Sequence, residues 1–95
     1  MEHTYTVSAA LTKLRSHGAH VSRNGYYRFI HPKLVACGVA KEVAPQVWRY
    51  AEPELSHWSE YIALVQKRKE AGTLPGNYEY NEMDCWQAAQ GEWDA

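Results

Sequence analysis

The 95-residue chain has 45% hydrophobic and 22% charged residues and a net charge of −1, a composition typical of one globular domain and not of a disordered or fibrous chain. It contains no apolar run of about 18 residues and no charged-then-apolar leader, so we expect a soluble, cytoplasmic protein that does not enter a membrane. Its two cysteines, Cys37 and Cys85, are too few for a disulfide scaffold and are expected to be reduced thiols.

The charges are divided unevenly along the chain. Residues 1–50 contain seven Lys or Arg and two Glu, whereas residues 51–95 contain three Lys or Arg and nine Asp or Glu. Either the two halves pack together and neutralise one another, or the protein has two surfaces of opposite sign that meet different partners.

The first predicted element is a short helix. Thr6 or Ser8 can cap its N-terminus, and the helix runs to about His17, where Gly18 supplies the left-handed stop. A helix this short is stable only when its apolar face packs against other elements.

Residues 19–30 are predicted to form a β-hairpin. Asn24-Gly25 is the residue pair that a type I′ turn prefers, and Val21 before it and the apolar residues after it are good strand formers. An isolated hairpin is only marginally stable, so this one needs support from helices, a third strand or a second chain.

Two helical segments are predicted next. His31-Pro32 favours a short helical turn over residues 32–37, and apolar residues at helical spacing predict a further helix from Ala40 to Ala51. Pro45 either begins that helix or kinks it.

The segment from Glu52 to Gly72 gives the strongest helical pattern. Glu52-Pro53 suits a helix start, three consecutive basic residues precede the end, and Gly72 ends it. The apolar stripe at helical spacing consists of Leu55, Trp58, Ile62 and Val65. We expect this helix to meet the preceding one near Glu52-Pro53 as an angled pair around Trp48 and Trp58.

The chain ends in an acidic, aromatic segment. Residues 73–77 are predicted to form a loop, and Asn81 caps a short helix over residues 82–90 that Gly91 ends. The fold expected is a mainly helical α+β domain over residues 1–76, with residues 77–95 packed on it or extending from it.

Metal and catalytic sites are weakly indicated. His17, His20, His31 and Cys37 are zinc-ligand types without a zinc-site spacing, and either cysteine with His31 or His57 gives only a generic nucleophile–base pair. We therefore expect no enzymatic activity, no metal and no cofactor.

Protein binding accounts for the composition of the C-terminal half. Aromatic side chains supply anchors and acids steer toward a basic partner, which predicts an inhibitor or adaptor that covers a partner's surface. Small inhibitors of bacterial defence complexes encoded by mobile elements, including phages, have this size. The predicted partner-binding residues are Tyr78, Glu79, Tyr80, Glu82, Asp84, Trp86, Glu92 and Trp93. Alternatively, Tyr78, Trp86 and Trp93 cover the long helix, and a lone stripe such as Met83 with Trp86 is more often core than docking surface.

Nucleic-acid binding by the basic half is the other alternative, although the acidic tail would repel phosphates. The residues predicted for it are Lys13, Arg15, Arg23, Tyr26, Tyr27, Arg28 and Lys33. Pairing of a second copy through an exposed hairpin edge or helical stripe is also open, which would give a homodimer.

Overall fold

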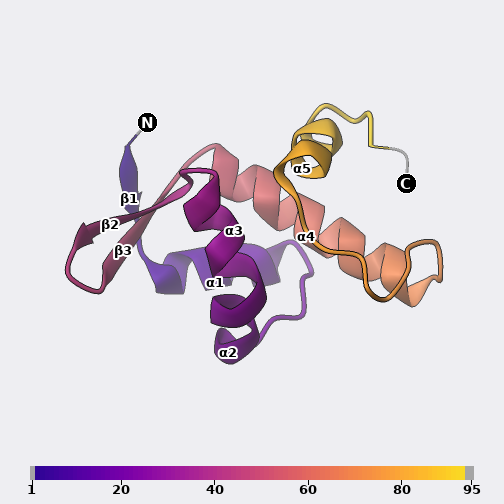
Figure 1. The fold of residues 1–95 in the computed structure, drawn as a ribbon, viewed down its shortest axis with the longest axis horizontal. Helices are drawn as coiled ribbons and strands as arrows, with labels where there is room; N and C mark the ends of the chain where they lie inside the picture. The colour runs from indigo at the N-terminus through magenta and orange to yellow at the C-terminus, as the bar shows by residue number, and fades with distance from the viewer. Residues whose placement is uncertain (1, 94–95) are drawn as a thin grey trace.

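The longest helix, α4 (Glu54–Glu70), runs along the long axis of the molecule, with a small sheet near its N-terminal end (Figure 1). The computed structural model describes residues 2–93, which measure 40 × 27 × 21 Å along their principal axes. The mainly helical α+β class predicted from the sequence is confirmed.

Helix α4 forms where its end signals place it. Gly72 has a φ of +77° just beyond the last turn, which is the left-handed conformation expected of a helix stop. All four residues of the predicted stripe are buried, together with Tyr61 and with Ser59, whose hydroxyl donates to the Leu55 carbonyl oxygen at 2.7 Å. The stripe therefore faces the core along its whole length.

Helix α1 (Val7–Ser16) also matches the prediction. The Thr6 hydroxyl accepts a hydrogen bond from the Ala9 amide at 3.1 Å, and Gly18 has a φ of +94° after the last turn. The buried face of α1 packs against α4 and consists of Ala10, Leu11 and Leu14.

The hairpin predicted over residues 19–30 is wrong. The structure has three consecutive helical elements there and beyond: α2 (Arg23–Gly25), η1 (Tyr26–Ile30) and α3 (His31–Ala36). Gly25 has right-handed helical angles, with φ −62° and ψ −36°, and not the positive φ of a type I′ turn. Ser22 decides the local structure, because its hydroxyl accepts from the Gly25 amide at 3.0 Å and so caps a helix.

Proline 32 explains why the middle of this helical run is widened. Element η1 is a π-helical turn that ends with the His31 amide donating to the Tyr26 carbonyl oxygen, five residues back. The wider turn leaves room for the ring of Pro32, which would otherwise clash with the preceding turn of an α-helix. Tyr26, Ile30 and Leu34, four residues apart, then share the buried face.

The helix predicted over residues 40–51 is also wrong. The segment forms two antiparallel strands, β2 (Ala40–Ala44) and β3 (Val47–Ala51), with Ala44 paired to Val47. Pro45 therefore neither begins nor kinks a helix. It precedes Gln46, whose φ of +61° suits the third position of a type II turn, where Pro is favoured at the second.

A third strand, β1 (His3–Tyr5), was not predicted, and it pairs with β3 to give the sheet order β1-β3-β2. A strand therefore leads into α4, and no second helix meets it at Glu52-Pro53. Trp48 is half-buried against His31, with ring centres 4.7 Å apart, whereas Trp58 is buried against Tyr61. The expected angled pair of helices around Trp48 and Trp58 is therefore wrong, because Trp48 lies on a strand.

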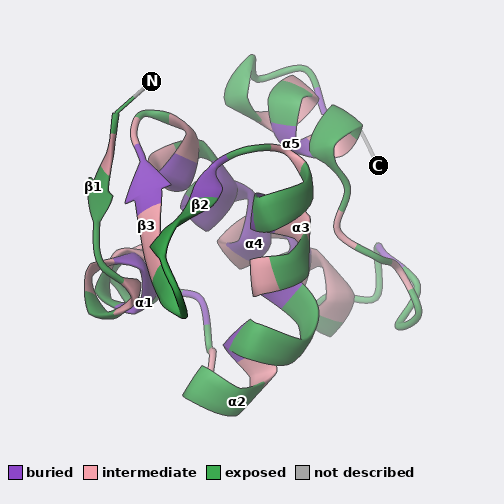
Figure 2. Ribbon diagram, turned by 60° about the vertical axis from the view of Figure 1, so that its left-hand side comes forward, coloured by how far each residue is buried: buried purple, intermediate pink, exposed green. Residues whose placement is uncertain are grey.

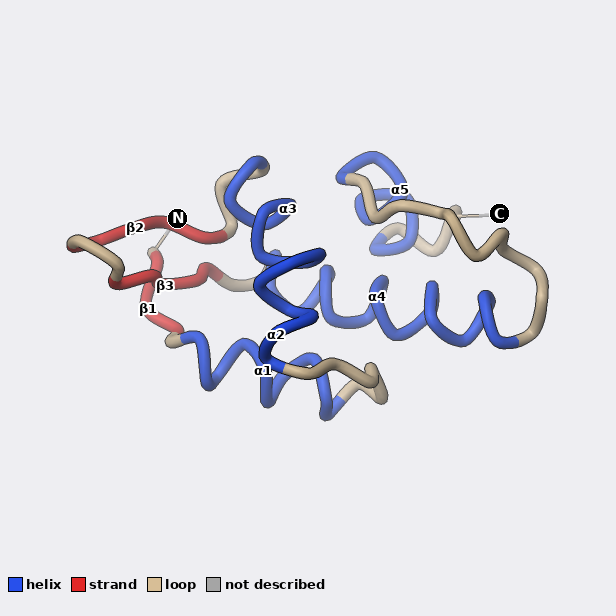
Figure 3. The backbone as a smooth tube through the Cα atoms, turned by 60° about the horizontal axis from the view of Figure 1, so that its bottom comes forward, coloured by secondary structure: helices blue, strands red, loops and turns tan. Residues whose placement is uncertain are grey.

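The C-terminal segment crosses back along α4 and ends in α5 (Glu82–Ala89), as predicted. The Asn81 side chain caps α5 by accepting from the Asp84 amide at 2.8 Å, and Gly91 has a φ of +75° after its last turn. Figure 3 shows α1 and α5 on opposite sides of α4. Figure 2 shows that most of the α5 ribbon belongs to exposed or partly buried residues, with a short buried stretch. No helix within residues 2–93 is long and apolar enough to cross a membrane.

Candidate functional site

Two large apolar side chains on α5 point away from the core. Met83 is 65% exposed and Trp86, three residues later on the same side of the helix, is 59% exposed. The opposite side of α5 is held on the core by Cys85, which is 4% exposed, and by the partly buried Ala88. The expectation that Met83 and Trp86 pack in the core is therefore wrong, and they form an exposed apolar pair.

The exposed pair borders a groove, which we call the acidic groove. It has a volume of about 590 Å³ and lies between α5, the N-terminal half of α4 and the connection from α3 to β2. The residues that define it here are Val39, Glu54, Trp58, Glu82, Met83 and Trp86. Among the described residues no Lys or Arg lines it, and its carboxylates are Glu54 and Glu82.

Glu54 has an unusual environment in this groove. Its Oε2 atom is shielded from solvent and accepts no hydrogen bond from any of residues 2–93. A buried carboxylate oxygen without a donor in the described part of the chain is costly.

A hydrogen-bond network joins the C-terminal segment to α4. The Tyr61 and Tyr78 hydroxyls are 2.5 Å apart, the Tyr78 hydroxyl donates to Asp84 Oδ2 at 2.6 Å, and the Asn81 amide donates to the Tyr61 hydroxyl at 3.1 Å. Burial and the neighbouring Asp84 carboxylate hold the pKa of Tyr78 well above its ordinary value, so the hydroxyl stays protonated and remains a donor.

Three of the four predicted aromatic anchors belong to the core side of this segment. Trp93 is 8% exposed, with the Arg68 guanidinium 4.5 Å from its ring centre, and Tyr78 and Tyr80 are half-buried. Tyr78 and Trp93 cover α4, as the alternative interpretation expected, whereas Trp86, which it also included, points outward.

The acidic residues are placed less uniformly than the prediction assumed. Glu79, Glu82 and Glu92 are exposed, but Asp84 is partly buried and bonded to Tyr78 and Asn81. Of the predicted acids only Glu82 lines the acidic groove, and Glu54, which the prediction did not include, lines it as well.

The predicted basic residues are dispersed. Lys13 forms an ion pair with Glu52 at 2.9 Å, Arg15 donates to the Val21 carbonyl oxygen, and Tyr26 is fully buried. Arg28 and Lys33 line one cleft, whereas Arg23 and Tyr27 are exposed but do not line it. The structure thus brings together only part of the predicted nucleic-acid-binding set.

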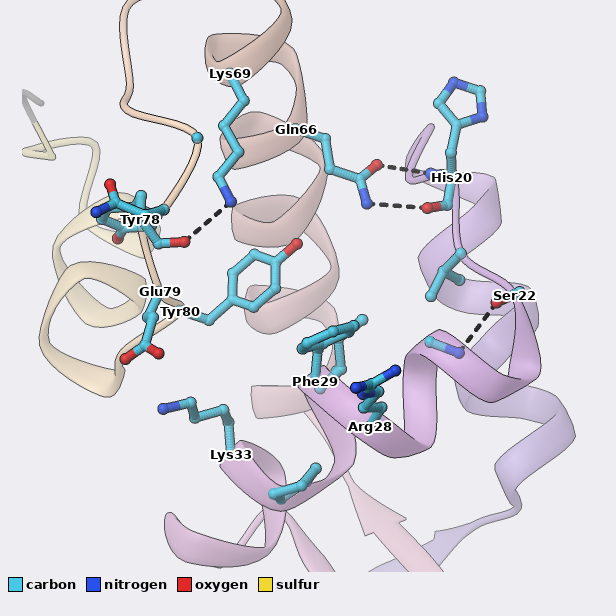
Figure 4. A pocket seen from close by; sticks show the side chains of 16 residues that line it. His20, Ser22, Arg28, Phe29, Lys33, Gln66, Lys69, Tyr78, Glu79 and Tyr80 are labelled. Carbon is cyan, nitrogen blue, oxygen red and sulfur yellow. Dashed lines mark hydrogen bonds between the residues drawn. The ribbon is translucent and has the colours of Figure 1, made fainter.

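Arg28 and Lys33 line a second concavity, the basic cleft, shown in Figure 4. It has a volume of about 710 Å³ and lies between the helical run η1–α3, the C-terminal part of α4 and the connection before α5. The residues that define it here are Arg28, Phe29, Lys33, Lys69, Glu79 and Tyr80. Phe29 and Lys69 were missed because the sequence does not show that residues 28–33, 69 and 79–80 meet.

Both cysteines and His57, which were considered as nucleophiles and base, line the acidic groove, whereas His31 does not. Within the described chain no three His, Cys, Asp or Glu side chains are placed to hold a metal ion. Burial raises the pKa of Cys85 to about 12 and also raises that of Cys37, so both thiols stay protonated at neutral pH. His31 is engaged by the Tyr50 hydroxyl at 3.0 Å.

Comparison with protein-family models, with characterised proteins and with solved structures finds no match to this chain. The function must therefore be argued from the acidic groove and the basic cleft themselves.

Proposed function

We propose that the protein is a binding protein that docks a basic segment of a partner protein, anchored by an apolar side chain, in the acidic groove. The observation that carries the proposal is the exposure of Met83 and Trp86 side by side at the edge of that groove. Trp and Met are enriched at the centres of protein interfaces, and paired exposed apolar residues beside a concavity mark docking surfaces.

The free energy available from this pair is large enough for specific binding. The exposed 59% of Trp86 corresponds to about 150 Å² of surface, whose burial is worth about 3–4 kcal/mol. Even half of that free energy changes an affinity about 20-fold.

The charges of the groove select the chemistry of the partner. Glu54 and Glu82 line the groove without a Lys or Arg among the described lining residues. A Lys or Arg of the partner would pair with these carboxylates at the groove. A basic segment therefore matches the negative potential of the groove.

Inhibition is the mode of action that we propose for such binding. A partner segment rich in Lys and Arg often contacts nucleic acid, and an acidic surface that covers it competes with the phosphates. A bacterial defence complex that binds nucleic acid is one class of partner with this property.

Selection from a displayed random peptide library tests the proposal without knowledge of the partner. We expect the selected peptides to share Lys or Arg residues flanking one large apolar residue, and to lose at least about 20-fold in affinity for the Trp86→Ala variant. Phe29→Ala is the matched control, because Phe29 has the same 59% exposure but lies in the basic cleft. Glu54→Gln combined with Glu82→Gln should weaken binding most at low salt.

Two results would overturn this function. The first is a set of selected peptides that has no excess of basic residues or binds Trp86→Ala as tightly as the parent protein. The second is a dimer in sedimentation experiments that dissociates in Trp86→Ala, since a second copy of the chain would then occupy the groove.

A further inference from the structure

We propose that the basic cleft is a second binding site, separate from the acidic groove, and that it takes an aromatic ring carrying a phosphate. A nucleotide has this chemistry, whether it is a free molecule or one unit of a single strand. The basic cleft shares no lining residue with the acidic groove, so the proposal can fail or succeed independently of the proposed function.

The first argument is the concentration of positive charge. Arg28, Lys33 and Lys69 line the cleft, and Glu79 is the only carboxylate among its described lining residues. None of the three basic side chains forms an ion pair with a carboxylate within residues 2–93, in contrast to Lys13. The chain as a whole has a net charge of −1, so this local excess is available for an anion and is not part of a uniformly basic surface.

The second argument is the presence of aromatic rings on opposite walls. Figure 4 shows Phe29 on the wall formed by η1 and the Tyr80 ring extending from the wall before α5. Phe29 is 59% exposed, and the Arg28 guanidinium lies 5.4 Å from its ring centre. Across the cleft the Lys69 ammonium lies 5.9 Å from the ring centre of Tyr80. Each wall thus places a cation beside a ring, which suits a base that stacks and a phosphate next to it.

The third argument is that the walls are fixed. The Gln66 side chain accepts from the His20 amide at 2.7 Å and donates to the His20 carbonyl oxygen at 3.0 Å, which ties the connection before α2 to α4. The Lys69 ammonium donates to the Tyr78 carbonyl oxygen at 2.9 Å and ties the opposite wall to the same helix. A cleft held on both sides loses little entropy when a ligand enters.

The size of the cleft limits the ligand. A volume of about 710 Å³ lies in the range of small-molecule sites and holds one or two nucleotides. The acidic C-terminal half would repel a long duplex, whereas a single nucleotide unit meets only the local positive charge.

Equilibrium dialysis and calorimetry at low salt test the site with defined probes: adenosine monophosphate, adenosine, inorganic phosphate and a six-nucleotide single-stranded DNA. We expect adenosine monophosphate to bind at least about 10-fold more tightly than adenosine or phosphate alone, because base and phosphate are held together. If the single strand binds about 10-fold more tightly than adenosine monophosphate, the site takes a nucleotide within a strand. If the two bind with equal affinity, the site takes a free nucleotide.

Variants connect the binding to the cleft. Phe29→Ala should weaken nucleotide binding about 10-fold or more, and Arg28→Gln with Lys33→Gln should weaken it similarly and flatten its salt dependence. Trp86→Ala, the variant that removes partner docking, should leave nucleotide binding unchanged. Circular dichroism and urea unfolding confirm that each variant is folded.

The proposal is overturned if neither the nucleotide nor the single strand binds saturably. It is equally overturned if phosphate or adenosine alone binds as tightly as the nucleotide, or if Phe29→Ala binds like the parent protein.

Discussion

Removal of one hydroxyl group from α4 tests how the C-terminal segment is held. Tyr61 is 1% exposed, and its hydroxyl accepts from the Asn81 amide and bonds with the Tyr78 hydroxyl. In Tyr61→Phe the Asn81 amide loses its acceptor, whereas Tyr78 retains its bond to Asp84. Each of the two lost hydrogen bonds is worth about 1 kcal/mol, and water can replace part of the bond to the exposed Asn81. We therefore expect the free energy of unfolding to fall by about 1–2 kcal/mol.

Urea unfolding followed by circular dichroism measures this loss as a lower midpoint with an unchanged slope. Tyr27→Phe is the control, because the same hydroxyl is removed from a side chain that is 41% exposed. Hydrogen exchange should show that α5 loses more protection than α1, since the lost bonds anchor α5 and not α1. The reasoning is refuted if the free energies of unfolding of Tyr61→Phe and Tyr27→Phe differ by less than about 0.5 kcal/mol.

Three further results follow from single sites. Burial raises the pKa of Glu52, but hydrogen bonds from Lys13 and a nearby serine outweigh it, so the folded pKa lies below the ordinary 4.5. The resulting stability is present above about pH 4.5 and is lost as pH falls through the folded pKa, so Glu52→Gln should flatten the acid limb of a stability–pH curve. With its pKa near 12, Cys85 at pH 8 is about one part in 10⁴ thiolate and should resist iodoacetamide until urea unfolds the chain. Gly72→Ala should cost about 1 kcal/mol in thermal unfolding through its φ of +77°, whereas Gly76→Ala, in open space, should cost less.

The elements that the sequence predicted correctly are those with chemical signals at both ends. Thr6 and Gly18 bound α1, Asn81 and Gly91 bound α5, and Gly72 ends α4. Caps and left-handed stops act within one helical turn, so the residues that decide them are adjacent in sequence.

The two wrong segments are those in which local preference and tertiary packing disagree. Asn24-Gly25 favours a hairpin turn, but the cap at Ser22 and the buried side chains of Tyr26 and Ile30, four residues apart, favour a helix. Over residues 40–51 the apolar residues recur at helical spacing, which predicted a helix, but the segment forms two strands. A run of strand formers follows Pro45, and pairing with β1, which is only three residues long and was not predicted, stabilises the sheet.

The candidate sites were predicted only in part for a related reason. Periodicity identified Met83 and Trp86 as one stripe of α5, but it did not show that Cys85 and Ala88 on the other side make the core contacts. The basic cleft brings together residues more than 40 positions apart, which no spacing within a single element reveals.

The two faces of α5 separate what keeps the protein folded from what it would recognise. Cys85 and Ala88 hold the helix on α4, and Asn81 fixes where it begins. Met83 and Trp86 contribute little to that attachment, because more than half of each side chain lies in solvent. Substitutions at these two positions could therefore change the choice of partner over evolutionary time while the fold stays intact, and descendants of one ancestor could share this scaffold and recognise different targets.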